Sequence, residues 1–210
     1  MQKVLITGGR GDIAQAIAKE LENTGGYEVF TPGREELDVT DWAKIEVVIS
    51  KFIPDILINN AGYVVPQSIK NADFEIIKNH IDINLGGVYY CTAAALKRNP
   101  TLSVINIGSS AATKIHATWS EYCATKAAVV MATQCWAEDG IYSVCISPGR
   151  AKTKMRKRLF PDEDQNTLML PEDFAKVVLK AVKKEYPAGS HINVNKQNVM
   201  SLINNHDGQN

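Results

Sequence analysis

The 210-residue chain has no surplus of charge: 23 Lys and Arg residues balance 23 Asp and Glu residues, so the formal net charge is zero. This balance gives no indication of a nucleic-acid or membrane-surface partner. No apolar run approaches the ~20 residues that a membrane-spanning helix requires. We therefore expect a soluble protein with a single domain over residues 1–203 and a polar, frayed tail over 204–210.

Cysteine is scarce, and the four residues are far apart: Cys91, Cys123, Cys135 and Cys145. They lack the spacing of a zinc site or a disulfide framework, which predicts free thiols and no bound metal. Met1 leads directly into a strand pattern with no hydrophobic leader segment. These features predict a cytoplasmic protein.

Short apolar runs alternate with longer segments of helical periodicity, which predicts an α/β fold with a parallel sheet. Strands are expected at residues 4–6, 28–31, 55–59, 103–107, 142–147 and 191–194, and helices at 12–23, 41–52, 73–84, 87–98, 119–138 and 171–185. Too few residues follow the second strand for a parallel crossover of the usual length. We therefore expect a shortened, Rossmann-type doubly wound sheet of six strands in the order 2-1-3-4-5-6, with helices on both faces.

A glycine-rich loop lies between the first predicted strand and the first helix. Glycines let a backbone approach a pyrophosphate, and the helix N-terminus offers free N–H groups and the positive end of its dipole. A plain glycine-rich turn would have the same composition, and the G-x-G-x-x-G spacing is not met. The residues predicted to contact a dinucleotide here are Thr7, Gly8, Gly9, Arg10, Asp12 and Ile13.

Tyr122 and Lys126 are four residues apart in a predicted helix, so their side chains share one face. A phenol titrates near pH ~10, and a neighbouring ammonium group favours its deprotonated form. An ordinary helix face explains most such pairs. Ser109 lies 13 residues before Tyr122 and follows a predicted strand, so its hydroxyl should emerge at the ligand-binding edge of the sheet. Ser110 is the neighbouring candidate.

Together these motifs resemble the single-domain branch of the short-chain dehydrogenase/reductase family over nearly the whole chain. Thr7 and Gly8 match the start of the family loop Thr-Gly-x-x-x-Gly-x-Gly, but Asp12 stands at its second glycine and Ala14 at its third. A carboxylate near a phosphate is unfavourable unless Asp12 turns back to cap the helix.

Three further segments are similar to family elements that shape the cofactor floor, contact adenine and hold the nicotinamide amide. The matching residues are Asn60, Ala61 and Gly62 in the first, Asp38 and Val39 in the second, and Pro148, Gly149, Ala151 and Thr153 in the third. The resemblance also implies a homodimer or homotetramer through the helices at 87–98 and 119–138.

The resemblance implies an NAD(P)-dependent oxidoreductase that transfers hydride between nicotinamide and a small ketone or secondary alcohol. Tyr122 would exchange the proton, and Ser109 would donate a hydrogen bond to the reacting oxygen. Lys126 would lower the pKa of Tyr122 and bind the nicotinamide ribose. Asn84 would hold a water that links Lys126 to solvent, while a helix kink or cap is its structural alternative.

Arg34 and Arg10 suit a bidentate contact with a 2′-phosphate, which predicts NADP (NADPH) in preference to NAD. Alternatively, both arginines are solvated and Glu35 binds the ribose of NAD. Residues 152–170 should form a lid over the substrate. Its basic residues are Lys152, Lys154, Arg156, Lys157 and Arg158. They form either a solvated face or subunit contact, or a site for an anionic substrate such as a phosphorylated sugar or an acyl carrier.

Two other functions share parts of this pattern. A sugar-nucleotide epimerase also uses Tyr-x-x-x-Lys but normally has a further C-terminal substrate domain. A non-catalytic dinucleotide sensor would not need Ser109, Tyr122 and Lys126 together. Turnover of carbonyl compounds separates the enzyme from the sensor.

Overall fold

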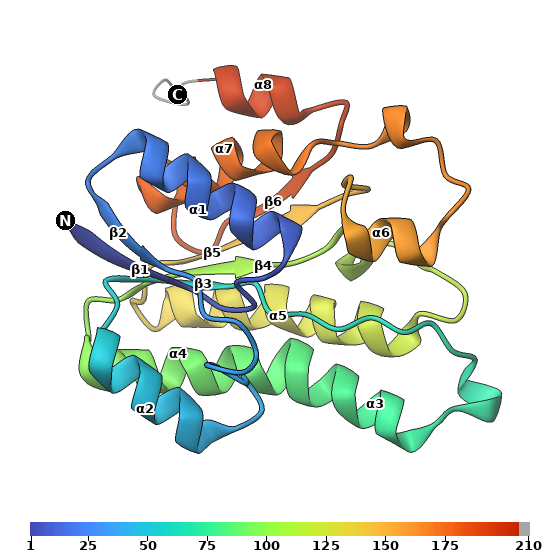
Figure 1. Cartoon of the computed structure of the whole chain (residues 1–210), viewed down its shortest axis with the longest axis horizontal. Helices are drawn as coiled ribbons and strands as arrows, with labels where there is room; N and C mark the ends of the chain where they lie inside the picture. Colours follow the sequence, from blue (N-terminus) through green and yellow to red (C-terminus); the bar gives the residue numbers. More distant parts are fainter. Residues whose placement is uncertain (206–210) are drawn as a thin grey trace.

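The computed structural model describes residues 1–205 of the chain. Six strands form one parallel sheet in the order β2-β1-β3-β4-β5-β6, which confirms the predicted topology (Figure 1). The strands are β1 (Gln2–Ile6), β2 (Tyr27–Phe30), β3 (Ile56–Asn59), β4 (Ser103–Ile107), β5 (Ser143–Pro148) and β6 (His191–Val194). Each overlaps its predicted range, because strands covered on both faces read as apolar runs.

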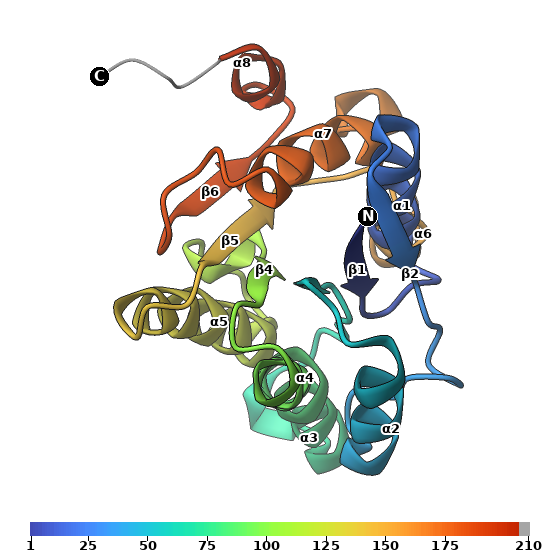
Figure 2. The same cartoon turned by 90° about the vertical axis from the view of Figure 1, so that its left-hand side faces the viewer.

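Helices cover both faces of the sheet (Figure 2). On one face lie α1 (Asp12–Thr24) and α7 (Pro171–Val182), with α8 (Val199–Asn204) beyond α7. On the other lie α2 (Trp42–Phe52), α3 (Phe74–Ile81), α4 (Gly87–Arg98) and α5 (Ser120–Glu138). The six-residue helices α6 (Lys154–Leu159) and α8 were not predicted, since helical periodicity needs a window of about 11 residues or more.

Alternate residues of the central strands enter two separate hydrophobic clusters. On β1, Val4 and Ile6 pack with α1 and α7, whereas Leu5 packs with α2 and α4. Burying one such side chain contributes roughly 1.5–3 kcal/mol to stability. Because all the strands are parallel, their carboxyl ends share one edge of the sheet, where their loops emerge together.

A π-helical turn joins two of the predicted helices. α3 runs into the π-helical turn η2 (Asp82–Gly86), which continues directly into α4. Such turns occur frequently at functional sites because they re-aim side chains. Asn84 lies in this turn, where the regular α-helical pattern is interrupted.

One other predicted helix, α7, ends earlier than expected. α7 begins at Pro171 as predicted, with two acidic residues in its first turn. It ends at Val182, short of residue 185, since Lys184 takes a left-handed conformation with φ of 60°. Three single-turn 3₁₀ helices lie in the connections: η1 (Ile69–Asn71), η3 (Ser110–Ala112) and η4 (Gln165–Thr167).

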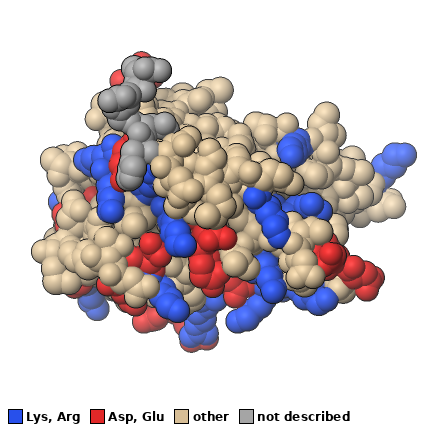
Figure 3. All heavy atoms as spheres, turned by 90° about the horizontal axis from the view of Figure 1, so that it is seen from above, with Lys and Arg blue, Asp and Glu red and all other residues tan. Residues whose placement is uncertain are grey.

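Basic and acidic side chains are interspersed on the face seen in Figure 3. Within residues 1–205, no helix is both long enough and apolar enough to traverse a lipid bilayer. No group of three or more His, Cys, Asp or Glu residues in the same range could hold a metal ion. The tail predicted to fray begins at the last residue of α8, and residues 206–210 lie outside the described range.

Candidate active site

Hydrogen bonds join the loops after β1 and β3 at the carboxyl edge of the sheet. The buried Thr7 accepts at Oγ1 from the backbone N–H groups of Asn60 and Ala61, each at 3.0 Å. Asn60 Nδ2 donates to the Thr7 carbonyl oxygen, also at 3.0 Å. Gly8 has a φ of +67°, and a Cβ there would lie 2.8 Å from Ala61 Cα. A glycine is therefore required for these loops to approach so closely.

A cleft of about 600 Å³ opens above these loops. The residues predicted to bind a dinucleotide that line it are Gly8, Arg10, Asp12, Ile13, Arg34, Asp38, Val39, Asn60, Ala61, Gly62, Tyr122, Lys126, Pro148 and Thr153. The remaining predicted residues support the cleft from behind. Gly9 N–H donates to the Pro32 carbonyl and Gly149 N–H to the Val194 carbonyl, while Ala151 is buried.

Several lining residues were not predicted from the sequence. They are Gly11, Leu37, Tyr63, Ile83, Ile107, Gly108 and Met155, whereas Lys154 and Arg158, which also line the cleft, were expected in the lid. Tyr63 directly follows the Asn-Asn-Ala-Gly element, so its position could have been inferred from that motif. Met155 and Arg158 lie on α6, which the sequence pattern did not indicate.

Tyr122 and Lys126 both face the cleft from α5, as their spacing predicts. Lys126 is 4% exposed, and its Nζ donates to the Ile107 carbonyl oxygen at 2.8 Å. The same nitrogen lies 5.9 Å from the centre of the Tyr122 ring. Burial lowers the pKa of Lys126 from 10.5 to about 8, because a cation loses hydration there.

The pKa of Tyr122 shifts in the direction opposite to the prediction. Burial raises the pKa of Tyr122 above 10.0, and a hydrogen bond with Ser109 opposes that rise. The Lys126 ammonium group does not offset the burial at its distance from the phenol ring. Tyr122 is therefore a protonated phenol at neutral pH, which suits a proton donor.

Ser109, and not Ser110, is the serine that acts on the pKa of Tyr122, which it lowers; its part in the reaction stays a prediction. Its Oγ also accepts from the N–H of Ala111 at 3.1 Å and so begins η3. Ser109 therefore places a hydroxyl beside the phenol of Tyr122 at the end of β4.

Asn84 is fully buried, and both ends of its amide bond the backbone of Tyr63. Asn84 Oδ1 accepts from the Tyr63 N–H at 2.7 Å, and Nδ2 donates to the Tyr63 carbonyl at 2.8 Å. The π-helical turn thus fixes the loop after β3, which forms one wall of the cleft. That Asn84 also holds a water remains a prediction.

The two arginines predicted to bind a 2′-phosphate lie at the same end of the cleft, each paired with an acid. Arg10 Nη2 lies 3.1 Å from Glu35 Oε2, and Arg34 Nε lies 2.9 Å from Asp38 Oδ2. The side chains of Arg10 and Arg34 are 71% and 79% exposed. Exposed pairs of this kind contribute about 0–1 kcal/mol, so both guanidinium groups can turn towards a ligand.

Asp12 does not cap its own helix. Capping was the condition under which a carboxylate would be acceptable beside a phosphate group in this loop. Gly11 is the N-cap of α1, and no side chain caps that helix end. Asp12 Oδ2 instead accepts from the backbone N–H of Lys154 at 2.6 Å. The N–H of Lys154, the first residue of α6, has no partner within its own helix, and Asp12 supplies one.

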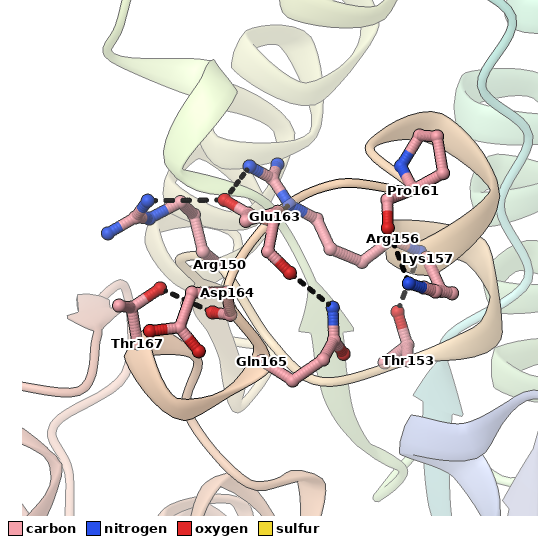
Figure 4. Close-up of polar contacts among 9 residues, drawn as sticks. All are labelled: Arg150, Thr153, Arg156, Lys157, Pro161, Glu163, Asp164, Gln165 and Thr167. Atoms are coloured by element: carbon pink, nitrogen blue, oxygen red, sulfur yellow. Dashed lines mark hydrogen bonds and ion pairs between the residues drawn. The ribbon is translucent and has the colours of Figure 1, made fainter.

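Glu163 binds Arg156 of the lid together with Arg150, which precedes the lid (Figure 4). It accepts from Arg150 Nη1 at 3.1 Å and from Arg156 Nε and Nη2 at 2.6 and 2.7 Å. The Arg156 guanidinium is the main reason that the pKa of Glu163 lies below its usual value. Arg156 therefore serves the folding of the lid, whereas Lys154 and Arg158 line the cleft.

An aromatic stack connects the lid to the helix of Tyr122. The Arg156 guanidinium lies 3.8 Å from the Phe160 ring centre, and Phe160 stacks on Trp119 with 6.0 Å between centres. Trp119 meets Tyr122 edge-on at 5.6 Å. Trp119 thus packs between the lid and Tyr122.

The parallel sheet, its strand order and the glycine loop before α1 define a Rossmann-type fold. A family model described as short chain dehydrogenase matches residues 2–164. The chain belongs to the short-chain dehydrogenase/reductase family, a family of oxidoreductases.

Curated relatives extend the similarity beyond the family model. A benzil reductase of Bacillus cereus is 27% identical over 92% of this chain and 99% of its own length. An uncharacterised oxidoreductase of Staphylococcus aureus (strain MW2) is 30% identical over 92% and 84%. A 3-oxoacyl-[acyl-carrier-protein] reductase of Rickettsia bellii is 29% identical over 92% and 95%. By contrast, the match to a dTDP-4-dehydrorhamnose reductase of Aggregatibacter actinomycetemcomitans spans 33% of that protein.

Solved structures share the fold over almost the whole chain. A short chain dehydrogenase/reductase family protein superimposes with a TM-score of 0.82 at 25% identity, covering 92% of this chain and 95% of that one. ElxO with NADP bound gives 0.80 at 24% identity, covering 96% and 100%.

Proposed function

We propose that this protein is an NADP-dependent carbonyl reductase or alcohol dehydrogenase acting on a small ketone or secondary alcohol. One observation carries the proposal: Tyr122 and the buried Lys126 line the same cleft as the glycine loop at the start of α1. A proton donor and a phosphate-binding helix terminus therefore serve one ligand site. Two relatives of similar length are named as reductases, which supports carbonyl reduction.

The residues of the cleft fit a nicotinamide dinucleotide. A Cβ at Gly9 would lie 2.1 Å from the Thr31 carbonyl oxygen, so the loop after β1 lies close to the chain after β2 and leaves the cleft open. Arg10 and Arg34 would hold the adenosine end, and Thr153 the nicotinamide end, while Asn60 supports the floor between them. When bound, the dinucleotide supplies or accepts the hydride.

Three side chains would act on the reacting oxygen or on the proton that it receives: those of Tyr122, Ser109 and Lys126. Tyr122 donates its proton to the substrate oxygen, and Ser109 donates a hydrogen bond to the same atom. Lys126, with a pKa of about 8, is mostly charged at pH 7 and stabilises the phenolate that Tyr122 becomes. Lys126 would also bind the hydroxyl groups of the ribose.

The proposal is tested by adding a panel of small ketones and aldehydes to the purified protein with NADPH. We expect loss of the near-ultraviolet absorbance of NADPH with at least one compound, in proportion to enzyme concentration. Phosphorylated and non-phosphorylated ketones of the same carbon skeleton show whether Lys152, Lys154, Lys157 and Arg158 select an anion. Dinucleotide binding without turnover of any carbonyl or alcohol would favour the non-catalytic sensor.

The choice of NADP is part of the proposal and makes a separate prediction. Wild-type protein should prefer NADPH strongly over NADH, and Arg34→Ala should weaken NADPH binding by about tenfold while leaving NADH binding within about twofold. The physical reason is that the lost guanidinium group contacts the 2′-phosphate, which NADH lacks. Titration of protein fluorescence with each dinucleotide measures both affinities.

Arg98→Ala is the matched control for this prediction, since Arg98 lies at the end of α4 in an ion pair with Glu46. It should change neither affinity. Equal use of NADH by the wild-type protein would remove the NADP assignment and favour Glu35 as the ribose-binding acid.

The proposal also includes a cytoplasmic homodimer or homotetramer, as the family resemblance implies. Tyr89 and Tyr90 on α4 and Met131 on α5 are exposed, with 45%, 51% and 61% of their surface accessible. Apolar side chains exposed on these two helices support a subunit contact there.

A further inference from the structure

Asp12 connects the nucleotide loop to the lid. Its side chain is 25% exposed, and its two oxygens both contact Lys154. Oδ2 accepts from the Lys154 backbone N–H at 2.6 Å, and Oδ1 lies 3.7 Å from Lys154 Nζ. These contacts hold the first residue of α6 against the first residue of α1, two elements that are 142 residues apart in the sequence.

The surroundings of Asp12 are otherwise suited to an anionic ligand. Asp12, Thr153, Lys154 and Arg158 line both the nucleotide cleft and a neighbouring hollow of about 490 Å³ on the lid. Lys152 and Lys157 add two more cations to that hollow. The positive end of the α1 dipole also favours negative charge at this position. Asp12 is therefore a carboxylate set among donors that a phosphate group would use.

The other acids of the cleft are placed differently. Asp38 pairs with Arg34 at the far end, and Glu35 pairs with Arg10 there. Within residues 1–205, neither Asp38 nor Glu35 forms a side-chain hydrogen bond with the lid. The negative charge at the phosphate end of the cleft thus comes from Asp12.

We propose that Asp12 is an internal competitor of the dinucleotide pyrophosphate and, in the free protein, a latch between the nucleotide loop and the lid. The proposal rests on the proposed function for its ligand. Asp12 and a phosphate group are both attracted to the N-terminus of α1 and to the Lys154 ammonium group. The two anions repel one another. Asp12 therefore lowers the affinity for the dinucleotide and holds the lid in place before binding.

Asp12→Asn tests the competition, because it removes the charge and keeps the size and an acceptor oxygen. The Kd for NADPH, measured by calorimetry in 50 mM salt, should fall about tenfold, a factor within the range of one carboxylate–phosphate repulsion near a protein surface. The gain should shrink towards about twofold in 500 mM salt, where the Debye length is only ~4 Å. Glu22→Gln, on the exposed end of the same helix, is the matched charge control and should leave the Kd unchanged. An unchanged or higher Kd for Asp12→Asn overturns the competition.

Hydrogen exchange of the Lys154 amide tests the latch without any ligand. Asp12→Gly removes the acceptor, so this amide should exchange about tenfold faster, whereas Asp12→Asn retains an acceptor and should change less. Unchanged exchange in Asp12→Gly overturns the latch. If the wild-type protein binds no dinucleotide, the proposed function fails, and the exchange measurement still decides whether Asp12 holds the lid.

Discussion

Replacing Tyr122 with Phe should lower kcat by about 10³-fold and change the Kd for NADPH by less than about twofold. In the proposed mechanism the hydroxyl gives its proton to the substrate oxygen, and Phe has no such group. The ring itself is kept, so its edge-on contact with Trp119 persists. Steady-state kinetics with the best carbonyl substrate and a fluorescence titration with NADPH measure the two quantities.

Tyr27→Phe provides the matched control, because Tyr27 is the first residue of β2 and so lies at the end of the strand away from the cleft. Removal of its hydroxyl should leave kcat and KM unchanged. If Tyr122→Phe retained more than a few per cent of the wild-type kcat, Tyr122 would not be the proton donor, and the proposed mechanism would be wrong.

Replacing Lys126 with Met should lower kcat by about 100-fold and, at the same time, stabilise the free protein at neutral pH. The pKa of Lys126 falls from 10.5 to about 8 on folding, which corresponds to a burial cost of about 3 kcal/mol when the group is charged. Loss of the hydrogen bond to the Ile107 carbonyl offsets about 1 kcal/mol of the gain. We therefore expect the free energy of unfolding to rise by about 2 kcal/mol at pH 7.

The sign of this effect follows from proton binding by the two states. Below pH 8 Lys126 is charged in both states, and the folded wild type bears the full cost of burial. Between pH 8 and 10.5 the unfolded state holds more protons, so wild-type stability from this group rises with pH. The advantage of Lys126→Met should accordingly shrink by pH 10. Urea unfolding of the wild type and of Lys126→Met without dinucleotide, at pH 7 and at pH 10, measures the difference in the free energy of unfolding.

Lys19→Met, on the exposed side of α1, controls for the loss of a surface charge and should alter neither kcat nor stability by a measurable amount. An equal loss of stability at both pH values in Lys126→Met would show that burial of the Lys126 charge is not a significant cost to the fold.

Much of the fold could be predicted from the chain because central strands such as those containing Leu5 and Leu57 are buried on both faces and read as unbroken apolar runs. Loop motifs were equally informative, since Gly8 and Thr7 must meet Ala61 and Asn60 at the ends of neighbouring strands. The pairing of Tyr122 with Lys126 followed from helical spacing alone. These features depend on near neighbours in the sequence.

The structure within the lid could not be predicted in the same way. α6 has six residues and too few turns for a periodic pattern, and its position depends on Glu163 gathering Arg150 and Arg156 from separate segments. The partner of Asp12 likewise could not be inferred, because Lys154 is 142 residues away and contributes its backbone N–H. A backbone donor leaves no signature in the residue type.

The sequence by itself determined the strand order, the glycine loop and the helix face that carries Tyr122 and Lys126, because apolar runs, turn residues and four-residue spacing are local consequences of residue type. Only the tertiary structure decided the protonation of that pair, since burial of Tyr122 and Lys126 raises one pKa and lowers the other. It also decided that Asp12 faces the lid. Desolvation and long-range backbone contacts depend on how the whole chain packs.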